Sequence, residues 1–65
     1  MYHMHVYYTA RDKETLYRFF EAVKREKIME KTREEDGNLK YEYYFSAERE
    51  NEILIVEEWK SKESQ

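Results

Sequence analysis

Apolar and polar residues alternate along the first ten positions of the chain, which is the pattern of a β-strand. The segment from Tyr2 to Ala10 is rich in tyrosine and threonine, both of which favour strands, and it has no helical period. One face would carry Tyr2, Met4, Val6 and Tyr8, and the other His3, His5, Tyr7 and Thr9. Because neither face is simply polar, we expect both to be covered.

A helical period follows this strand. Asp12 is a suitable N-cap, and Leu16, Phe19, Phe20 and Val23 fall on one stripe at helical spacing. We expect one long helix that runs to about Glu35, with a bend or a second contact surface near Ile28, where the apolar stripe drifts. The only glycine of the chain, Gly37, is expected to stop this helix in a left-handed conformation and to lead into the next strand.

Two further strands are predicted after the glycine. Leu39 to Ser46 alternates, with Leu39, Tyr41, Tyr43 and Phe45 on one face. Glu52 to Trp59 is apolar on both faces at its centre, as in a strand that is buried on both sides. The order is therefore β-α-β-β, and its single helix covers only one sheet face. A second copy of the same sheet is the most economical cover for the other face.

Composition narrows the class of protein. A chain of 65 residues forms one domain with a small core, and the absence of cysteine leaves a partner subunit as the main source of extra stability. The net charge of -3 comes from interspersed charges of both signs, which argues against nucleic-acid binding. No apolar run is long enough to span a membrane, and no signal peptide is visible, so we expect a cytoplasmic protein.

Two motifs resemble the antibiotic biosynthesis monooxygenase (ABM) family: "EDGNLKY", from Glu35 to Tyr41, and "EEWKS", from Glu57 to Ser61. The resemblance implies an α+β ferredoxin-like fold, β-α-β-β-α-β, in which two subunits pair their sheets into a dimeric α/β barrel. The last helix and strand of that pattern would follow Gln65. We therefore expect residues 1–65 to be a single ABM-type domain that is incomplete at its C-terminus.

The resemblance also implies a chemistry. Family members oxidise quinols or polyphenols with molecular oxygen as co-substrate, without a metal or flavin cofactor, in a cavity between sheet and helices. The implied protein is a quinol monooxygenase-like homodimer, paired through the sheet face, that acts on a small aromatic substrate. Close relatives instead degrade haem or isomerise a small metabolite. A non-catalytic module for ligand binding or dimerisation is a further alternative.

Candidate catalytic residues are Trp59, then His5 and His3. Trp59 matches the family motif and would contact the substrate, although a tryptophan can equally anchor the end of a strand. The histidines would accept a phenol proton, or else they are polar residues of a sheet edge or barrel interior. Substrate-binding candidates are Tyr41, Tyr7 and Phe20, each of which also suits sheet or core packing. No complete set of metal ligands is visible.

Two adjacent carboxylates precede the tryptophan. Glu57 and Glu58 are neighbours on a strand and so point to opposite faces, which excludes a catalytic dyad within one chain. Glu57 shares its face with Trp59, Ile53 and Ile55. A buried, hydrogen-bonded carboxylate is one alternative, but we expect a salt bridge across a strand or a dimer interface, with Lys40 or Arg49 as partner.

Overall fold

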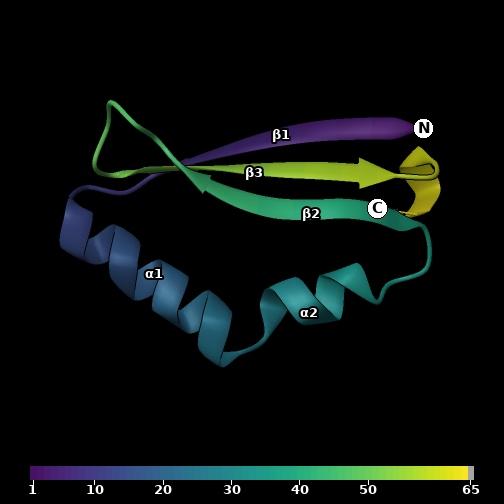
Figure 1. Ribbon diagram of the computed structural model, residues 1–65, viewed down its shortest axis with the longest axis horizontal. Helices are drawn as coiled ribbons and strands as arrows, with labels where there is room; N and C mark the ends of the chain where they lie inside the picture. Colours follow the sequence, from purple (N-terminus) through teal and green to yellow (C-terminus); the bar gives the residue numbers. More distant parts are fainter. Residues whose placement is uncertain (65) are drawn as a thin grey trace.

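The computed structural model describes residues 1–64. Its elements are β1 (Tyr2–Thr9), α1 (Lys13–Arg25), α2 (Ile28–Arg33), β2 (Asn38–Phe45), β3 (Glu52–Trp59) and a 3₁₀ turn η1 (Lys62–Ser64). The strands form one antiparallel sheet in the order β1-β3-β2, and both helices lie on the same side of it (Figure 1). The predicted α+β ferredoxin-like fold is confirmed, with two helices in place of the single helix expected between the first two strands.

The sheet has the topology of a split β-α-β unit. Both β1 and β2 run antiparallel to β3, so they are parallel to each other and are joined by a crossover through the helices. This is the arrangement found in ferredoxin-like folds. It places β3 at the centre of the sheet, where its side chains contact both neighbouring strands.

The core lies between α1 and the sheet. Leu16 of α1 and Ile53 of β3 are fully buried, both with 0% of their surface exposed. The ring of Tyr8 packs on that of Phe19 at 4.4 Å between centroids. Asp12 caps the helix by accepting a hydrogen bond from the Thr15 backbone N–H at 2.7 Å, which satisfies one of the free donors of the first turn. The predicted cap and stripe are thus confirmed.

The prediction of one long helix to Glu35 is wrong, whereas the expected bend near Ile28 is confirmed. Lys27 adopts a left-handed conformation with φ of 56°, which ends α1 and starts α2 in a new direction. No side chain of α2 is buried. Lys27 lies where the apolar stripe of α1 would need its next apolar residue. A continuous helix would therefore have gained no further apolar burial against the sheet.

Gly37 has φ of 91°, which confirms the predicted left-handed glycine. It occupies the third position of a turn in which the Asn38 N–H donates to the Glu35 carbonyl at 3.1 Å. Its own carbonyl accepts from the Lys60 N–H at 2.8 Å. The predicted role as a helix stop is wrong, since α2 already ends at Arg33. The glycine instead sets the start of β2 and ties it to the end of β3.

The predicted face of β2 needs one correction, at Leu39. The register shifts between Asn38 and Lys40, because Asn38 pairs with Trp59 and Lys40 pairs with Glu58. Leu39 is therefore the extra residue of a bulge, and it is 48% exposed. Tyr41 and Tyr43 keep their predicted place on the side that faces the helices.

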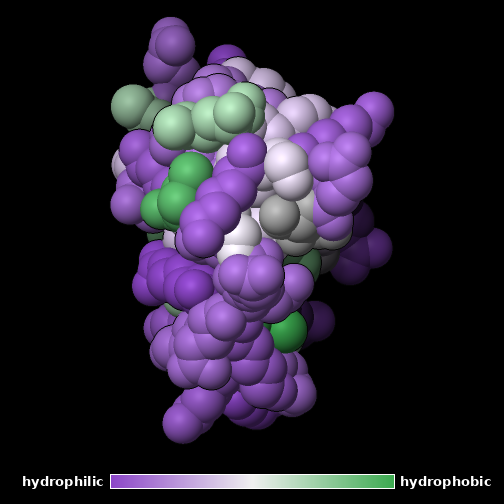
Figure 2. All heavy atoms as spheres, turned by 90° about the vertical axis from the view of Figure 1, so that its right-hand side faces the viewer, coloured by the Kyte–Doolittle hydropathy of each residue, from purple (hydrophilic) through white to green (hydrophobic). Residues whose placement is uncertain are grey.

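The opposite side of the sheet, here called the open face, is covered by neither helix (Figure 1). Strand β1 contributes His3, His5, Tyr7 and Thr9 to it, β3 contributes Leu54, Val56 and Glu58, and β2 contributes Lys40, Glu42 and Tyr44. Figure 2 views the end of the molecule that carries η1, where hydrophilic residues dominate and hydrophobic ones form small separate patches. Within residues 1–64, no helix has the length and apolar character needed to span a membrane.

Candidate functional site

A polar cluster lies on the helix-facing side of the sheet, at the end of β3. Glu57 and Trp59 alternate with Glu58 along the strand and so share this side. Trp59 is the only tryptophan of the chain and is 3% exposed. Its indole Nε1–H donates to Oε1 of Glu57 at 3.0 Å. The buried indole thus has its hydrogen-bond partner, and one carboxylate oxygen is fixed in position.

Two tyrosines of β2 complete the cluster. Tyr41 is the cross-strand partner of Glu57, and the hydroxyls of Tyr41 and Tyr43 lie 3.0 Å apart. Burial raises the pKa of Tyr43 well above its ordinary value, and the hydrogen bond to Tyr41 and the nearby charges of Tyr41 and Glu57 raise it further. Tyr43 therefore remains a neutral phenol, able to donate a hydrogen bond.

Aromatic rings extend this cluster toward α1. Phe20 packs against Tyr43 with 6.0 Å between ring centroids, and against Phe45 at 5.2 Å in an edge-on arrangement. The rings of Tyr41 and Tyr43 are also edge-on, at 5.5 Å. Flat aromatic surfaces therefore lie next to hydroxyl donors and a carboxylate acceptor. Chemically, this combination suits a flat aromatic guest that carries its own hydroxyl groups.

The predicted site residues are divided between the two sides of the sheet. Trp59, Tyr41 and Phe20 lie on the helix-facing side, within or beside the polar cluster. His3, His5 and Tyr7 lie on the open face, since their neighbours on β3 are Glu58, Val56 and Leu54 respectively. Nδ1 of His3 is 3.8 Å from a carboxylate oxygen of Glu58. The sheet therefore separates both histidines from Trp59.

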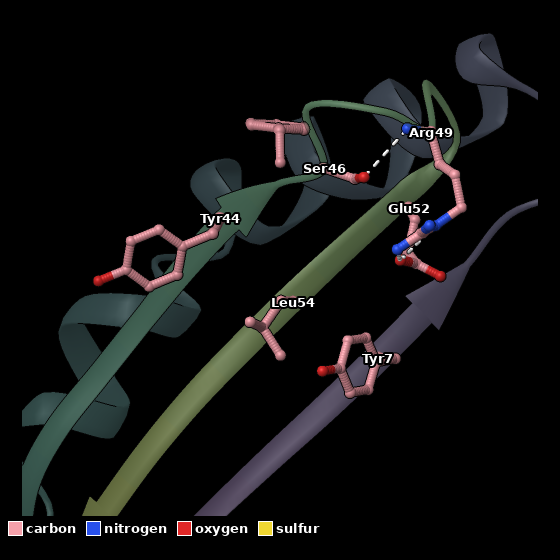
Figure 3. Close-up of a pocket in the computed structure, with 7 residues that line it drawn as sticks. Tyr7, Tyr44, Ser46, Arg49, Glu52 and Leu54 are labelled. Atoms are coloured by element: carbon pink, nitrogen blue, oxygen red, sulfur yellow. Dashed lines mark hydrogen bonds and ion pairs between the residues drawn. The ribbon is translucent and has the colours of Figure 1, made fainter.

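A shallow pocket of about 150 Å³ lies on the open face, away from the polar cluster (Figure 3). Tyr7, Leu54 and Tyr44 come from three adjacent strands and line it. At its upper end Arg49 donates from Nε and Nη2 to the same oxygen of Glu52, at 2.9 and 2.8 Å. Hydrogen bonds from Arg49 and then from Thr9 lower the pKa of Glu52, so this carboxylate stays charged.

The comparison with known families decides the relationship. The family model for antibiotic biosynthesis monooxygenases matches residues 1–65. The chain belongs to the ABM family. No curated protein and no solved structure gives a significant match. The resemblance inferred from the two sequence motifs is thus confirmed, and membership supports a monooxygenase-like or related small-molecule-binding function.

In this ABM chain, the sequence interpretation did not include Glu57 and Tyr43 in the site. Within the chain, the expected salt bridge from Glu57 to Lys40 or Arg49 is wrong, and the alternative of a hydrogen-bonded carboxylate is confirmed by the bond from Trp59. Lys40 lies on the open face, 3.9 Å from Glu42, and Arg49 pairs with Glu52. A signal for Glu57 was present, because strand periodicity places it beside Trp59. Tyr43 carried the same signal, since it alternates with Tyr41 on β2.

Metal ligation in this ABM chain has few candidate side chains. Across residues 1–64, no three side chains of His, Cys, Asp or Glu come together as a ligand group. The two histidines alternate along β1 on the open face, and His3 has Glu58 as its acidic neighbour. The helix-facing cluster offers one carboxylate, one indole and two phenols, which are groups that bind organic hydroxyls well.

Proposed function

We propose that this protein is a monooxygenase that oxidises a quinol or another polyphenol with molecular oxygen, without a metal or flavin cofactor. The observation that carries the proposal is the hydrogen bond from Trp59 to Glu57, set beside the Tyr41–Tyr43 hydroxyl pair under an aromatic wall. A polyphenol presents a flat ring and hydroxyl groups, and the cluster offers matching partners for both. Family membership supports this class of chemistry.

The proposed reaction needs little from the protein beyond position and proton transfer. A phenol that loses its proton gives an electron readily to oxygen, and the resulting organic radical and superoxide then combine. The protein would bind the ring against its aromatic side chains and exclude water while the radicals exist. Tyr43, which remains a neutral phenol, would donate a hydrogen bond to an oxygen of the substrate.

We also propose that two copies associate through their open faces. Tyr7 is 63% exposed there, and it flanks the side chains of Leu54 and Val56 at the centre of the sheet. Charged groups surround this apolar centre: Arg49 with Glu52 at one end, His3 with Glu58 at the other, and Glu42 beside Val56 on β2. Such a face suits a two-fold partner, which would cover the apolar centre. The histidines would then lie between the sheets.

Oxygen consumption tests the proposed activity. The purified protein is mixed with menadiol, a reduced naphthoquinone, in the presence of a chelator and without flavin. We expect uptake above the rate of autoxidation, and loss of this excess in Trp59→Phe. The control is Tyr17→Phe, which removes an exposed hydroxyl of α1 and keeps the ring that packs on Phe45. No excess uptake from a folded sample would contradict the monooxygenase proposal and favour a non-catalytic binding module.

Light scattering after gel filtration tests the proposed association. A dimer is expected for the unaltered chain and a monomer for Leu54→Glu, which places a charge at the apolar centre of the open face. The same charge at Leu39, which projects from the bulge of β2, is the control and should leave the dimer intact. A monomer in every sample would overturn the proposed pairing.

A further inference from the structure

The hydrogen-bond partner of Glu57 is a neutral side chain, whereas several other carboxylates of the described chain pair with a cation. Glu14, Glu21 and Glu52 each pair with a lysine or arginine at the surface. Within residues 1–64, Glu57 forms no ion pair, and its hydrogen-bond donor is the neutral indole of Trp59. A carboxylate without a cation keeps its full capacity to accept further hydrogen bonds or a proton.

Glu57 lies on the helix-facing side of the sheet, so any further hydrogen bond or proton that it accepts comes from a group on that side. On β3 it lies between Tyr41 of β2 and Met4 of β1, which are its two cross-strand partners. The Glu57 side chain is half-buried, so it lies at the boundary of the aromatic cluster rather than in bulk water. Trp59 occupies Oε1, which leaves Oε2 for another donor.

The other titratable groups near the site are poor proton acceptors. Tyr43 is held in its neutral form by burial and by its bond to Tyr41, so it acts as a donor. His3 and His5 lie on the open face, on the far side of the sheet. Glu57 is therefore the acceptor that shares a side with Trp59.

We infer that Glu57 binds a hydroxyl group of the phenolic substrate through Oε2 and takes its proton during oxidation. This inference rests on the proposed function and names the base of that reaction. In the step, the O–H bond of the quinol breaks and an O–H bond forms on Glu57, while one electron passes from the ring to oxygen. The products are a neutral semiquinone radical, superoxide and a protonated Glu57. The two transfers assist each other, because a ring that is losing an electron becomes strongly acidic, and this allows a carboxylate to accept the proton in the same step.

Turnover gives the first test. Glu57→Gln keeps the size of the side chain and an oxygen for the Trp59 indole, but it cannot take up a proton. We expect menadiol-dependent oxygen uptake to fall by about 10²- to 10⁴-fold, the usual contribution of a general base. Glu58→Gln is the matched control on the same strand, since Glu58 points to the open face, and its rate should stay within about twofold of the unaltered rate. Circular dichroism and thermal unfolding establish that both variants fold. An unchanged rate in folded Glu57→Gln would overturn the inference while leaving the proposed activity in place.

Binding without turnover gives the second test, and it separates the inference from the proposed activity. Calorimetry compares 1-naphthol with 1-methoxynaphthalene, which has the same ring system but no hydroxyl to donate. The unaltered chain should prefer 1-naphthol by about tenfold or more, the usual effect of a hydrogen bond to a charged group. Glu57→Gln should lose most of this preference and Glu58→Gln should keep it. Equal affinities for the two compounds in the unaltered chain would overturn the inference, whether or not oxygen uptake is observed.

Discussion

Asn51 and Ala10 are joined by two hydrogen bonds where the loop after β2 meets the end of β1. The Ala10 N–H donates to the Asn51 carbonyl at 2.8 Å, and the Asn51 side-chain amide donates to the Ala10 carbonyl at 2.7 Å. Ala10 is buried, so its carbonyl has little access to water. One side chain thus fixes the loop before β3 against the segment that leads into α1.

The first prediction concerns this contact. Asn51→Ala removes the side-chain donor and leaves the buried carbonyl of Ala10 unsatisfied, which should lower the free energy of unfolding by about 1–3 kcal/mol. Urea unfolding followed by circular dichroism measures the change. Glu50→Ala, an exposed neighbour in the same loop, is the control and should stay within about 0.5 kcal/mol of the unaltered protein. Equal losses in the two variants would show that the loop itself, rather than the bond, is sensitive.

A second prediction pairs Lys27 and Gly37, the two residues with positive φ in the described part of the chain. Lys27 takes this conformation with a side chain, whereas Gly37 takes it without one. Lys27→Gly should therefore leave stability unchanged or raise it by up to about 1 kcal/mol, because it removes a steric clash of about 1–2 kcal/mol that outweighs or balances the chain entropy that glycine adds to the unfolded state. Gly37→Ala should lower stability by about 1–2 kcal/mol or more. Thermal unfolding measures both, and shifts in the same direction would contradict the backbone explanation.

The third prediction compares two leucines of opposite exposure. Leu16 is fully buried in the core, and Leu39 projects from the bulge of β2 with 48% of its surface exposed. Leu16→Ala should cost about 2–5 kcal/mol of unfolding free energy, because it opens a cavity between α1 and β3. Leu39→Ala should cost less than about 0.5 kcal/mol. A large effect at Leu39, measured by urea unfolding, would mean that its side chain packs against a partner.

The fourth prediction concerns pH. The pKa of Tyr43 is raised in the folded protein, chiefly by burial, so its neutral form stabilises the fold. That contribution is fully present below the unfolded pKa of about 10 and is lost as the pH rises above it. Tyr43→Phe cannot ionise, so its stability should decline less steeply than that of the unaltered protein between about pH 9.5 and 11.

Urea unfolding at several pH values in this range measures the two slopes. The control is Tyr17→Phe, which removes an exposed phenol of α1. If Tyr17→Phe flattens the alkaline decline as much as Tyr43→Phe does, the effect is a general consequence of losing one tyrosine. A decline in Tyr43→Phe as steep as in the unaltered protein would also argue against burial as the cause.

Strand periodicity was sufficient to locate the sheet. The third strand was predicted with the bounds that the structure has, Glu52–Trp59, and the other two within one residue at each end. The break at Lys27 was harder, because lysine carries no local signal for a left-handed conformation. Its φ is set by how α1 and α2 pack on the sheet, which is a tertiary effect. The bulge at Leu39 likewise depends on how β2 pairs with β3.

Half of the site could be read from the alternation along β3, which places Glu57 beside Trp59. The bond between them and the meeting of two phenols with a carboxylate required the register of β2 against β3. Alternation along β1 likewise placed both histidines on one face of that strand, opposite the face that carries Met4 and Val6. Which face the helices cover depends on chain connectivity, and a single strand does not reveal it.

The central place of β3 has a consequence for how the chain folds. Within residues 1–64, both β1 and β2 take all their sheet partners from β3, which is the last of these three strands in sequence. During synthesis the first two strands therefore have no sheet partner until Glu52–Trp59 has left the ribosome. Sheet formation must then close long-range contacts on both sides of one strand, a step that tends to be slow and cooperative. Until that moment, two tyrosine-rich strands have unpaired edges that are prone to aggregation. These strands are the segments that a chaperone would bind.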